Sequence, residues 1–170
     1  MALIPTEGSL LDATEGLIVH GCNAQGVMGS GVAAAVREMY PQAFRDYRAA
    51  YERQGHRLHL GQIIWTRIST EPKLAVANAI TQEFYGRDPN RVYADYQAIE
   101  TIFTKLGHYA RQWQVPVHFP LIGAGLANGD WGIIEPIIEK ALDGVQHTLW
   151  IPKGQAMPTP KTSAARRHRP

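Results

Sequence analysis

The sequence predicts an α/β fold with a largely parallel sheet, on two observations. Short apolar runs alternate with segments of helical spacing along residues 3–151, which is typical of parallel strands connected by helices. Two of the apolar runs end in glycine-rich loops that lead directly into helical segments, as strand-to-helix turns do in such folds. At 170 residues, the chain has the length of one domain with an ordinary core.

The first third of the chain supplies two expected strands and a long helical segment. Residues 3–11 predict an opening strand, and residues 17–20 predict a buried one. Residues 32–51 carry apolar side chains at helical spacing. Pro41 lies inside this segment and is expected to kink or split the helix, because proline lacks the backbone N–H that a helix interior needs.

The remaining segments continue the alternation. Two strands, at 61–68 and 74–80, flank a turn at 69–72 and are expected to pair antiparallel. Residues 93–112 predict a helix from their apolar spacing. The last expected elements are a strand at 115–119, a helix at 131–142 and a strand at 147–151.

The composition is that of an ordinary soluble domain, with 45% hydrophobic and 19% charged residues. No apolar run approaches the roughly 18 residues of a membrane span, and the first residues lack the features of a signal peptide. The single cysteine, Cys22, permits no internal disulfide and suits a reducing compartment. We therefore expect a cytoplasmic protein without a membrane segment.

The net charge of +2 conceals an uneven distribution. Residues 153–170 hold five basic residues and no acid, which leaves 12 basic and 15 acidic residues in the rest of the chain. We interpret 153–170 as a flexible, solvated basic tail, with weak nonspecific contact to nucleic acid as the alternative. The body has no basic stripe with interleaved aromatic residues, so nucleic acid is not the expected partner.

The first glycine-rich loop follows the buried strand and contains Asn23, Gly26, Gly29 and Gly31. Glycines at such a turn let backbone N–H groups approach a ligand without a Cβ in the way. The N-terminus of the helix that follows adds partial positive charge. The loop therefore predicts a site for a nucleotide or a sugar phosphate.

A second loop of the same kind spans residues 119–131 and also lies between an apolar run and a helical segment. It contains Gly123, Gly125 and Gly129 and ends at Asp130. Two glycine loops at the carboxyl ends of strands can face each other across the crevice of an open sheet. Together they predict a phosphate site much more specifically than either loop alone.

Two common phosphate-binding classes do not fit. No segment matches the P-loop pattern G-x-x-x-x-G-K-[ST]. Gly29, Gly31 and Ala34 match the dinucleotide pattern G-x-G-x-x-A, but that pattern also needs an acidic residue at the end of the next strand. The next strand closes with residues 66–68, which include no carboxylate, so a nicotinamide oxidoreductase is disfavoured.

The two loops together resemble the macro domain. The resemblance lies in Asn23 with residues 26–33, and in residues 120–126 with 129–131, and it covers about residues 1–152. It is closer to the branch of ADP-ribose 1″-phosphate phosphatases. The resemblance implies a three-layer α/β/α fold with a mixed, largely parallel sheet of six strands and with ADP-ribose in a cleft at the strand ends.

The resemblance also implies roles for individual residues. Asn23 would bond the hydroxyls of the distal ribose, loop 26–32 would wrap that ribose and its phosphate, and loop 122–126 would offer N–H groups to the diphosphate. Asp130 would activate or orient water near the 1″ position, which makes Asp130 and Asn23 the expected catalytic residues. The full expected ligand-binding set is Ser9, Leu10, Gly21, Cys22, Asn23, Gly26, Val27, Met28, Gly29, Ser30, Gly31, Val32, Ile122, Gly123, Ala124, Gly125 and Leu126.

Two departures from the family pattern stand out. Many macro domains carry an Asp near the first strand to recognise the adenine amino group, whereas this chain has Ser9 after Gly8. A related branch that removes ADP-ribose from acidic side chains or DNA uses a lysine after the fourth strand. Residues 81–85 contain no lysine, which argues against that mechanism.

Several of these residues also have structural interpretations. Asp130 is well placed to cap the next helix, and Asn23 to satisfy the backbone of its own turn. Arg87 and Arg91 lie in a polar loop and either meet a terminal phosphate or remain solvated. Three aromatic residues, Tyr85, Trp131 and Trp150, are expected to pack in the core, with stacking of one of them on the adenine as the alternative. Three further side chains are expected to be structural, in strands or in the core: His20, His118 and Cys22.

The favoured hypothesis is a hydrolase that converts ADP-ribose 1″-phosphate to ADP-ribose. The alternatives are a noncatalytic module that binds ADP-ribose and a hydrolase that removes ADP-ribose from modified macromolecules. We expect a monomer whose partner is the small molecule itself, with no cofactor. No metal is expected either, because no histidine pair with zinc spacing has a third ligand.

Overall fold

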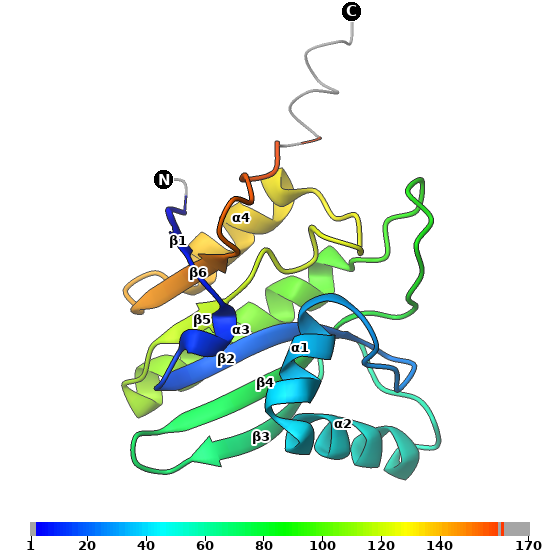
Figure 1. Cartoon of the computed structure of the whole chain (residues 1–170), viewed down its shortest axis with the longest axis horizontal. Coiled ribbons are helices and arrows are strands. Elements are labelled where there is room, and N and C mark those ends of the chain that lie inside the picture. The colour runs from blue at the N-terminus through cyan, green and yellow to red at the C-terminus, as the bar shows by residue number, and fades with distance from the viewer. Residues whose placement is uncertain (1–2, 160, 162–170) are drawn as a thin grey trace, which may run out of the picture.

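A computed structural model describes residues 3–159 and 161 and shows a six-stranded sheet between two layers of helices (Figure 1). The spatial order of the strands is β1-β6-β5-β2-β4-β3. All neighbouring strands are parallel except β3 and β4, which pair antiparallel as predicted. The strands are β1 (Pro5–Glu7), β2 (Gly16–Asn23), β3 (Ile63–Ser69), β4 (Leu74–Gln82), β5 (Val117–Phe119) and β6 (His147–Ile151).

Within residues 3–159, four α-helices cover the sheet, two on each face, which confirms the predicted α/β/α layers. The pair α1 (Gly31–Met39) and α2 (Pro41–Arg53) packs on one face, and the pair α3 (Tyr96–Trp113) and α4 (Trp131–Ala141) packs on the other (Figure 1). None of the helices in the described residues has both the length and the apolarity needed to cross a membrane.

The central strand β2 is covered by helices on both faces, which explains why it is apolar at nearly every position. Leu17 and Val19 pack in the core beneath α3 and α4, whereas Ile18 and Cys22 pack beneath α1 and α2. Side chains alternate between the faces of a strand, so a strand covered on both faces is apolar at nearly every position. The short apolar run 17–20 is therefore the middle of a longer strand.

The helical segment 32–51 is divided at proline, as predicted. The first helix ends at Met39, and the second begins with Pro41, at a position where its missing N–H costs nothing. The predicted opening strand 3–11 is wrong beyond Glu7. There Ser9 accepts a hydrogen bond from the Leu11 N–H and begins a short 3-10 turn, Leu10–Asp12, that takes the chain out of the sheet.

The strand order creates a crevice at one edge of the sheet. From β2 the chain passes into α1 on one face, and from the adjacent β5 it passes into α4 on the opposite face. Where neighbouring parallel strands send their connections to opposite faces, their carboxyl ends leave an opening between the two loops. Both glycine-rich loops lie at this opening.

A buried polar chain joins the sheet to α2. The His20 Nε2 lies 2.6 Å from the Asn78 Oδ1, and the Asn78 amide donates to the Thr66 hydroxyl at 3.1 Å. The Thr66 hydroxyl in turn donates to Asp46 of α2 at 2.8 Å. Burial lowers the pKa of His20 to about 4, so the imidazole is neutral at physiological pH. His20 is therefore a structural residue, as predicted.

Candidate functional site

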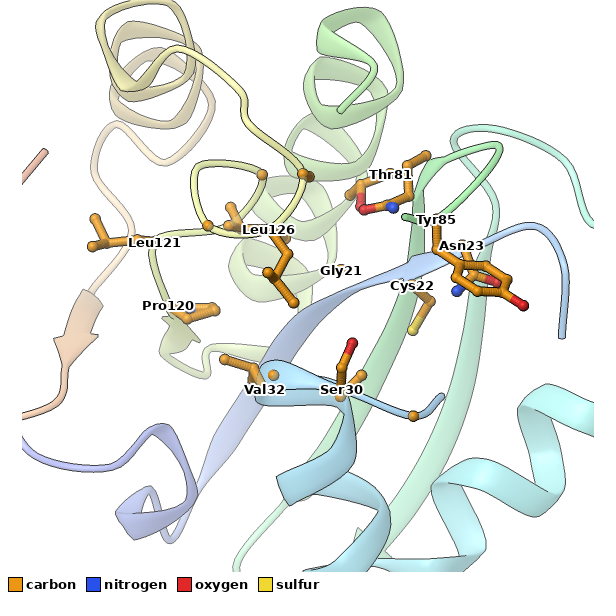
Figure 2. Close-up of a pocket in the computed structure, with 18 of the residues that line it drawn as sticks. Gly21, Cys22, Asn23, Ser30, Val32, Thr81, Tyr85, Pro120, Leu121 and Leu126 are labelled. Atoms are coloured by element: carbon orange, nitrogen blue, oxygen red, sulfur yellow. The ribbon is translucent and has the colours of Figure 1, made fainter. Parts of the chain in front are cut away.

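A cavity of about 550 Å³ lies at the carboxyl ends of β2, β4 and β5, within the size range of small-molecule sites. Figure 2 shows Asn23, Thr81 and Tyr85 toward one end, and Pro120 and Leu121 toward the other. The first loop forms one wall, and the second glycine loop forms the wall opposite it. The cavity therefore occupies the crevice that the strand order creates.

Asn23 ends β2 and holds the first loop in shape. Its Oδ1 accepts hydrogen bonds from the Gln25 N–H at 2.9 Å and from the Tyr47 hydroxyl at 2.9 Å. Its Nδ2 donates to the Val27 carbonyl at 2.7 Å. An amide has two N–H donors, and the hydrogen bonds within the described residues use one of them. Asn23 thus forms the turn while it also lines the cavity.

The Tyr47 hydroxyl of α2 supports the loop from below. It shares its one proton between the Asn23 carbonyl at 2.5 Å and the Asn23 Oδ1 at 2.9 Å, and it accepts from the Gly26 N–H at 3.1 Å. The side chain is fully buried, and burial raises the pKa of Tyr47, so the hydroxyl keeps its proton. Gly26 has a φ of +77° and lies so close to the Tyr51 ring that a Cβ would fall 2.6 Å from it. Only glycine fits there.

The N-terminus of α1 opens onto the cavity. Ser30, Gly31, Val32 and Ala33, which are the N-cap and first turn, all line it. Ser30 occupies the N-cap position, but its side chain makes no capping hydrogen bond. The first N–H groups of a helix have no partner within the helix, and the helix dipole adds partial positive charge there. This end of α1 therefore favours an anion.

The second loop contributes further backbone donors. Its Ile122 and Ala124 N–H groups are used within the loop, bonding Pro120 at 2.7 Å and Leu121 at 3.2 Å. The N–H groups of the other lining residues of segment 122–126 make no hydrogen bond within the described residues; these are Gly123, Gly125 and Leu126. They are the donors that this wall can offer to a ligand.

The charges of the cavity also suit an anion. Among its described lining residues, Arg87 is the one charged side chain, and no carboxylate is present. The described residues contain no cluster of three His, Cys, Asp or Glu side chains that could hold a metal ion. A cavity with a cation, a helix N-terminus and backbone donors suits a phosphorylated ligand.

Most of the predicted binding residues meet around this cavity. The lining includes twelve of them: Gly21, Cys22, Asn23, Val27, Gly29, Ser30, Gly31, Val32, Ile122, Gly123, Gly125 and Leu126. Their roles in binding remain predictions.

Five predicted binding residues do not line the cavity, because each has another place in the structure. Ser9 caps the 3-10 turn, and Leu10 and Met28 are buried in the cores beneath α1 and α2. Gly26 packs on Tyr51, and Ala124 uses its N–H within its own loop.

Asp130 also lies outside the lining, at the N-terminus of α4. Its Oδ1 accepts from the Gly132 N–H at 2.8 Å and from the Lys161 N–H at 3.0 Å, and its own N–H donates to the Tyr96 hydroxyl at 2.9 Å. Asp130 is 5% exposed. The structure therefore gives Asp130 the capping geometry outside the lining, and its catalytic role remains a prediction.

Cys22 and His20 do not form a nucleophilic pair. The Cys22 Sγ lies 3.7 Å from Nε2 and 3.8 Å from Nδ1 of His20, so the sulfur favours neither ring nitrogen. Burial raises the pKa of the Cys22 thiol and lowers that of His20, so both groups are neutral. A protonated thiol is a weak nucleophile, which leaves Cys22 as a small apolar lining residue.

Trp150 lines the cavity and is fixed by His118. The indole N–H donates to the His118 Nδ1 at 3.0 Å, and the His118 Nε2 bonds the Glu15 carbonyl at 2.9 Å. Burial lowers the pKa of His118, which favours the neutral ring that this pattern requires. His118 is thus structural, as predicted, while Trp150 reaches the site.

Several lining residues were not predicted from the sequence. Thr81 and Gln82 follow from the register, since Gln82 of β4 lies beside Asn23 of β2, so the end of β4 was a usable signal. Pro152 and Gln155 come from the segment after β6, and Gln155 falls within residues 153–170, whose basic composition pointed to a tail instead. Residues 160 and 162–170 of that predicted tail lie outside the described residues.

Curated relatives support the family resemblance at two ranges of identity. An ADP-ribose 1″-phosphate phosphatase from Candida albicans is 24% identical over 139 residues, which cover 79% of this chain and 86% of that protein. One from Aspergillus clavatus is 51% identical over 45 residues. That shorter match covers 26% of this chain and spans 23% of the Aspergillus protein.

A solved structure and a family model agree on the fold. A protein of unknown function from Bacteroides thetaiotaomicron superposes with a TM-score of 0.78 at 25% identity, covering 88% of this chain and 98% of that one. The family model described as Macro domain matches residues 19–138, a range that contains both glycine loops, the whole of β5 and the last five residues of β2. The chain belongs to the macro domain family.

Proposed function

We propose that the cavity binds ADP-ribose 1″-phosphate and that the protein hydrolyses its terminal phosphate to give ADP-ribose. Two kinds of observation support this function. The curated relatives from Candida albicans and Aspergillus clavatus are named ADP-ribose 1″-phosphate phosphatases. The cavity offers a charge pattern and a size that suit a nucleotide sugar carrying several phosphates.

The observation that carries the proposal is the pairing of two backbone donor sets on opposite walls. The N-terminus of α1 lies on one wall, and the N–H groups of Gly123, Gly125 and Leu126 lie on the other. A diphosphate between them receives hydrogen bonds from both sides. Backbone donors held by the fold need no reorganisation on binding, so they stabilise phosphate charge efficiently.

The distal ribose lies at the end of the cavity formed by Asn23 and Tyr85. The remaining N–H of the Asn23 Nδ2 donates to a ribose hydroxyl, while the other hydrogen bonds of Asn23 keep the amide in place. The adenosine half then extends toward Trp150 and Gln155. An aromatic side chain that is held by His118 offers a rigid apolar surface at that end.

Hydrolysis requires water to attack the terminal phosphorus. A P–O bond to water forms, the bond between phosphorus and the 1″ oxygen breaks, and the proton lost by water ends on the departing oxygen. No carboxylate is present among the described lining residues, so the site acts by positioning the substrate and stabilising charge. Asp130 is not among the described lining residues and its Oδ1 caps α4, so the proposed reaction routes no proton through it; Asp130→Asn tests its predicted catalytic role. Turnover without a general base is slow.

The absence of a carboxylate among the described lining residues favours one second candidate, a module that binds ADP-ribose without catalysis. Release of inorganic phosphate from ADP-ribose 1″-phosphate separates the two functions. We expect release that scales with protein concentration and is lost in Gly125→Trp. The backbone at Gly125 does not have a positive φ, and a Cβ added there would meet nothing within 4 Å, so the indole fills the cavity without straining the loop. Binding of ADP-ribose with no phosphate release would support the noncatalytic module.

A further inference from the structure

The connection between β4 and α3 contributes the one positively charged side chain among the described lining residues of the cavity. Arg87 lines the cavity, as do its neighbours Tyr85 and Gly86. Among the described residues, Arg87 makes no ion pair and no hydrogen bond, and its guanidinium is not neutralised by a lining carboxylate. A cation that lines a cavity with free backbone donors, without a partner in the described protein, is available to an anionic ligand.

Arg91 of the same connection provides a contrast. Its guanidinium lies over two aromatic rings, 5.4 Å from the centroid of Phe84 and 4.9 Å from that of Tyr93. Arg91 does not line the cavity. The two arginines are four positions apart, but one packs on the connection and the other lines the site.

The backbone around Arg87 is firmly anchored. On one side, a Cβ on Gly86 would fall 2.3 Å from the Tyr93 hydroxyl oxygen, so the chain passes Tyr93 at a distance that only glycine permits. On the other side, the Asp88 N–H donates to the same hydroxyl at 3.2 Å. The Asn128 amide of the second glycine loop donates to the Asp88 carbonyl at 2.9 Å. Arg87 is therefore held between two fixed residues and tied to a wall of the cavity.

We propose that Arg87 recognises the terminal phosphate on the distal ribose and so selects ADP-ribose 1″-phosphate over ADP-ribose. This inference rests on the proposed function and assigns the specificity of its site. Arg87 lines the cavity two residues after Tyr85, and Figure 2 shows Tyr85 beside Asn23, where the distal ribose is placed. A guanidinium bonds two phosphate oxygens at once, and a terminal phosphate carries about −1.5 to −2 of charge on one phosphorus, whereas each phosphorus of the diphosphate carries about −1.

ADP-ribose 1″-phosphate and ADP-ribose differ by the terminal phosphate that Arg87 would contact. Comparing the affinities for the two ligands therefore isolates the contribution of Arg87. In Arg87→Gln we expect the affinity for ADP-ribose 1″-phosphate to fall about tenfold and the affinity for ADP-ribose to change less than about twofold. Arg87 is exposed, so salt screens its interaction, and the loss should shrink as ionic strength rises. Arg91→Gln is the matched control and should leave the ratio of the two affinities at its wild-type value.

Calorimetric titration of wild type, Arg87→Gln and Arg91→Gln with both ligands decides the question. An equal loss for both ligands in Arg87→Gln, or no loss for either, would overturn the assignment. Wild-type protein that binds both ligands but releases no phosphate would remove the hydrolytic function, while the affinity ratio would still support or overturn the role of Arg87. Wild-type protein that binds neither ligand would overturn both proposals.

Discussion

At the scale of single residues, one buried hydroxyl sets the shape of the first loop. Tyr47 bonds both Asn23 and Gly26, so Tyr47→Phe removes a donor and an acceptor from the support of the loop. We expect ADP-ribose affinity to fall by about threefold to tenfold and the free energy of unfolding to fall by about 1 kcal/mol. Calorimetry and urea unfolding measure the two effects.

The control for this change is Tyr51→Phe, on the same helix. The Tyr51 hydroxyl makes no hydrogen bond within the described residues, while its ring packs against Gly26. Phenylalanine keeps that ring, so both affinity and stability should stay near wild type. An equal effect of the two substitutions would contradict a positioning role for the Tyr47 hydroxyl.

A second residue-scale prediction concerns pH. Burial lowers the pKa of His20 from 6.5 to about 4, so between these values the unfolded chain binds a proton that the folded chain does not. Stability contributed by the neutral ring is therefore complete above pH 6.5 and declines as the pH falls toward 4. Between about pH 7 and about pH 5, the loss from this group is about 2 kcal/mol.

His20→Gln tests the source of this loss. Glutamine does not titrate and still offers an N–H to the Asn78 Oδ1, which His20 approaches at 2.6 Å in the wild type. Urea unfolding at about pH 7 and about pH 5 should show a smaller difference in the variant than in the wild type, by about 2 kcal/mol. The same difference in both proteins would show that other groups cause the acid sensitivity.

The local sequence predicted residues that line the proposed binding site, but it did not predict the residues that hold those lining residues in place. Asn23 and the loop glycines were predictable because asparagine and glycine are rare within strands and, where a strand ends, mark a turn or a site of close backbone approach. Tyr47 was predictable only as an apolar position on a helix. Its contact with Asn23 joins residues 24 positions apart, and no pattern in the sequence encodes that pairing.

At the scale of elements, the cap of α4 separates two interpretations of Asp130. Asp130→Ala removes the acceptor for the Gly132 N–H and should lower the free energy of unfolding by about 1 kcal/mol. Asp130→Asn keeps a good capping side chain but removes the carboxylate. We expect Asp130→Asn to keep near wild-type stability and to retain phosphate release within about twofold. A large loss of release in a stable Asp130→Asn protein, measured with substrate binding intact, would restore the catalytic hypothesis.

The elements themselves were largely predictable because local signals marked their ends. Pro41 divides α1 from α2, and the turn before Leu74 separates the antiparallel pair. The opening strand was predicted too long because apolar residues return after Glu7, at Leu10 and Leu11, whereas Ser9 and Asp12 form reciprocal hydrogen bonds that start a 3-10 turn instead. Short hydrogen-bonded turns of this kind override an apolar pattern.

At the scale of the whole molecule, the site results from strand order. Because β2 and β5 are neighbours and send the chain to opposite faces, two loops about a hundred residues apart meet at one opening. The alternation of strands and helices predicted such an opening. It did not predict which further strand borders it, since the pairing of β4 with β2 depends on long-range packing.

The segment after β6 also makes long-range contacts that its local sequence did not predict. Pro152 and Gln155 line the cavity, and the Lys161 N–H and Nζ bond Asp130 and Asn128 at 3.0 and 3.1 Å. The composition of residues 153–170 predicted solvation, because charged, proline-containing ends lack apolar anchors. The contacts that hold its first part come from the second glycine loop, which lies far away in the sequence.

Calorimetric titration of the wild-type protein with ADP-ribose tests most directly whether this cavity is the nucleotide site. We predict a saturable one-to-one isotherm, much weaker binding of AMP, which lacks the distal ribose and the second phosphate, and loss of binding in Gly125→Trp. An absence of binding to ADP-ribose, or equal binding by the wild type and the Gly125→Trp variant, would contradict the assignment of the cavity to ADP-ribose.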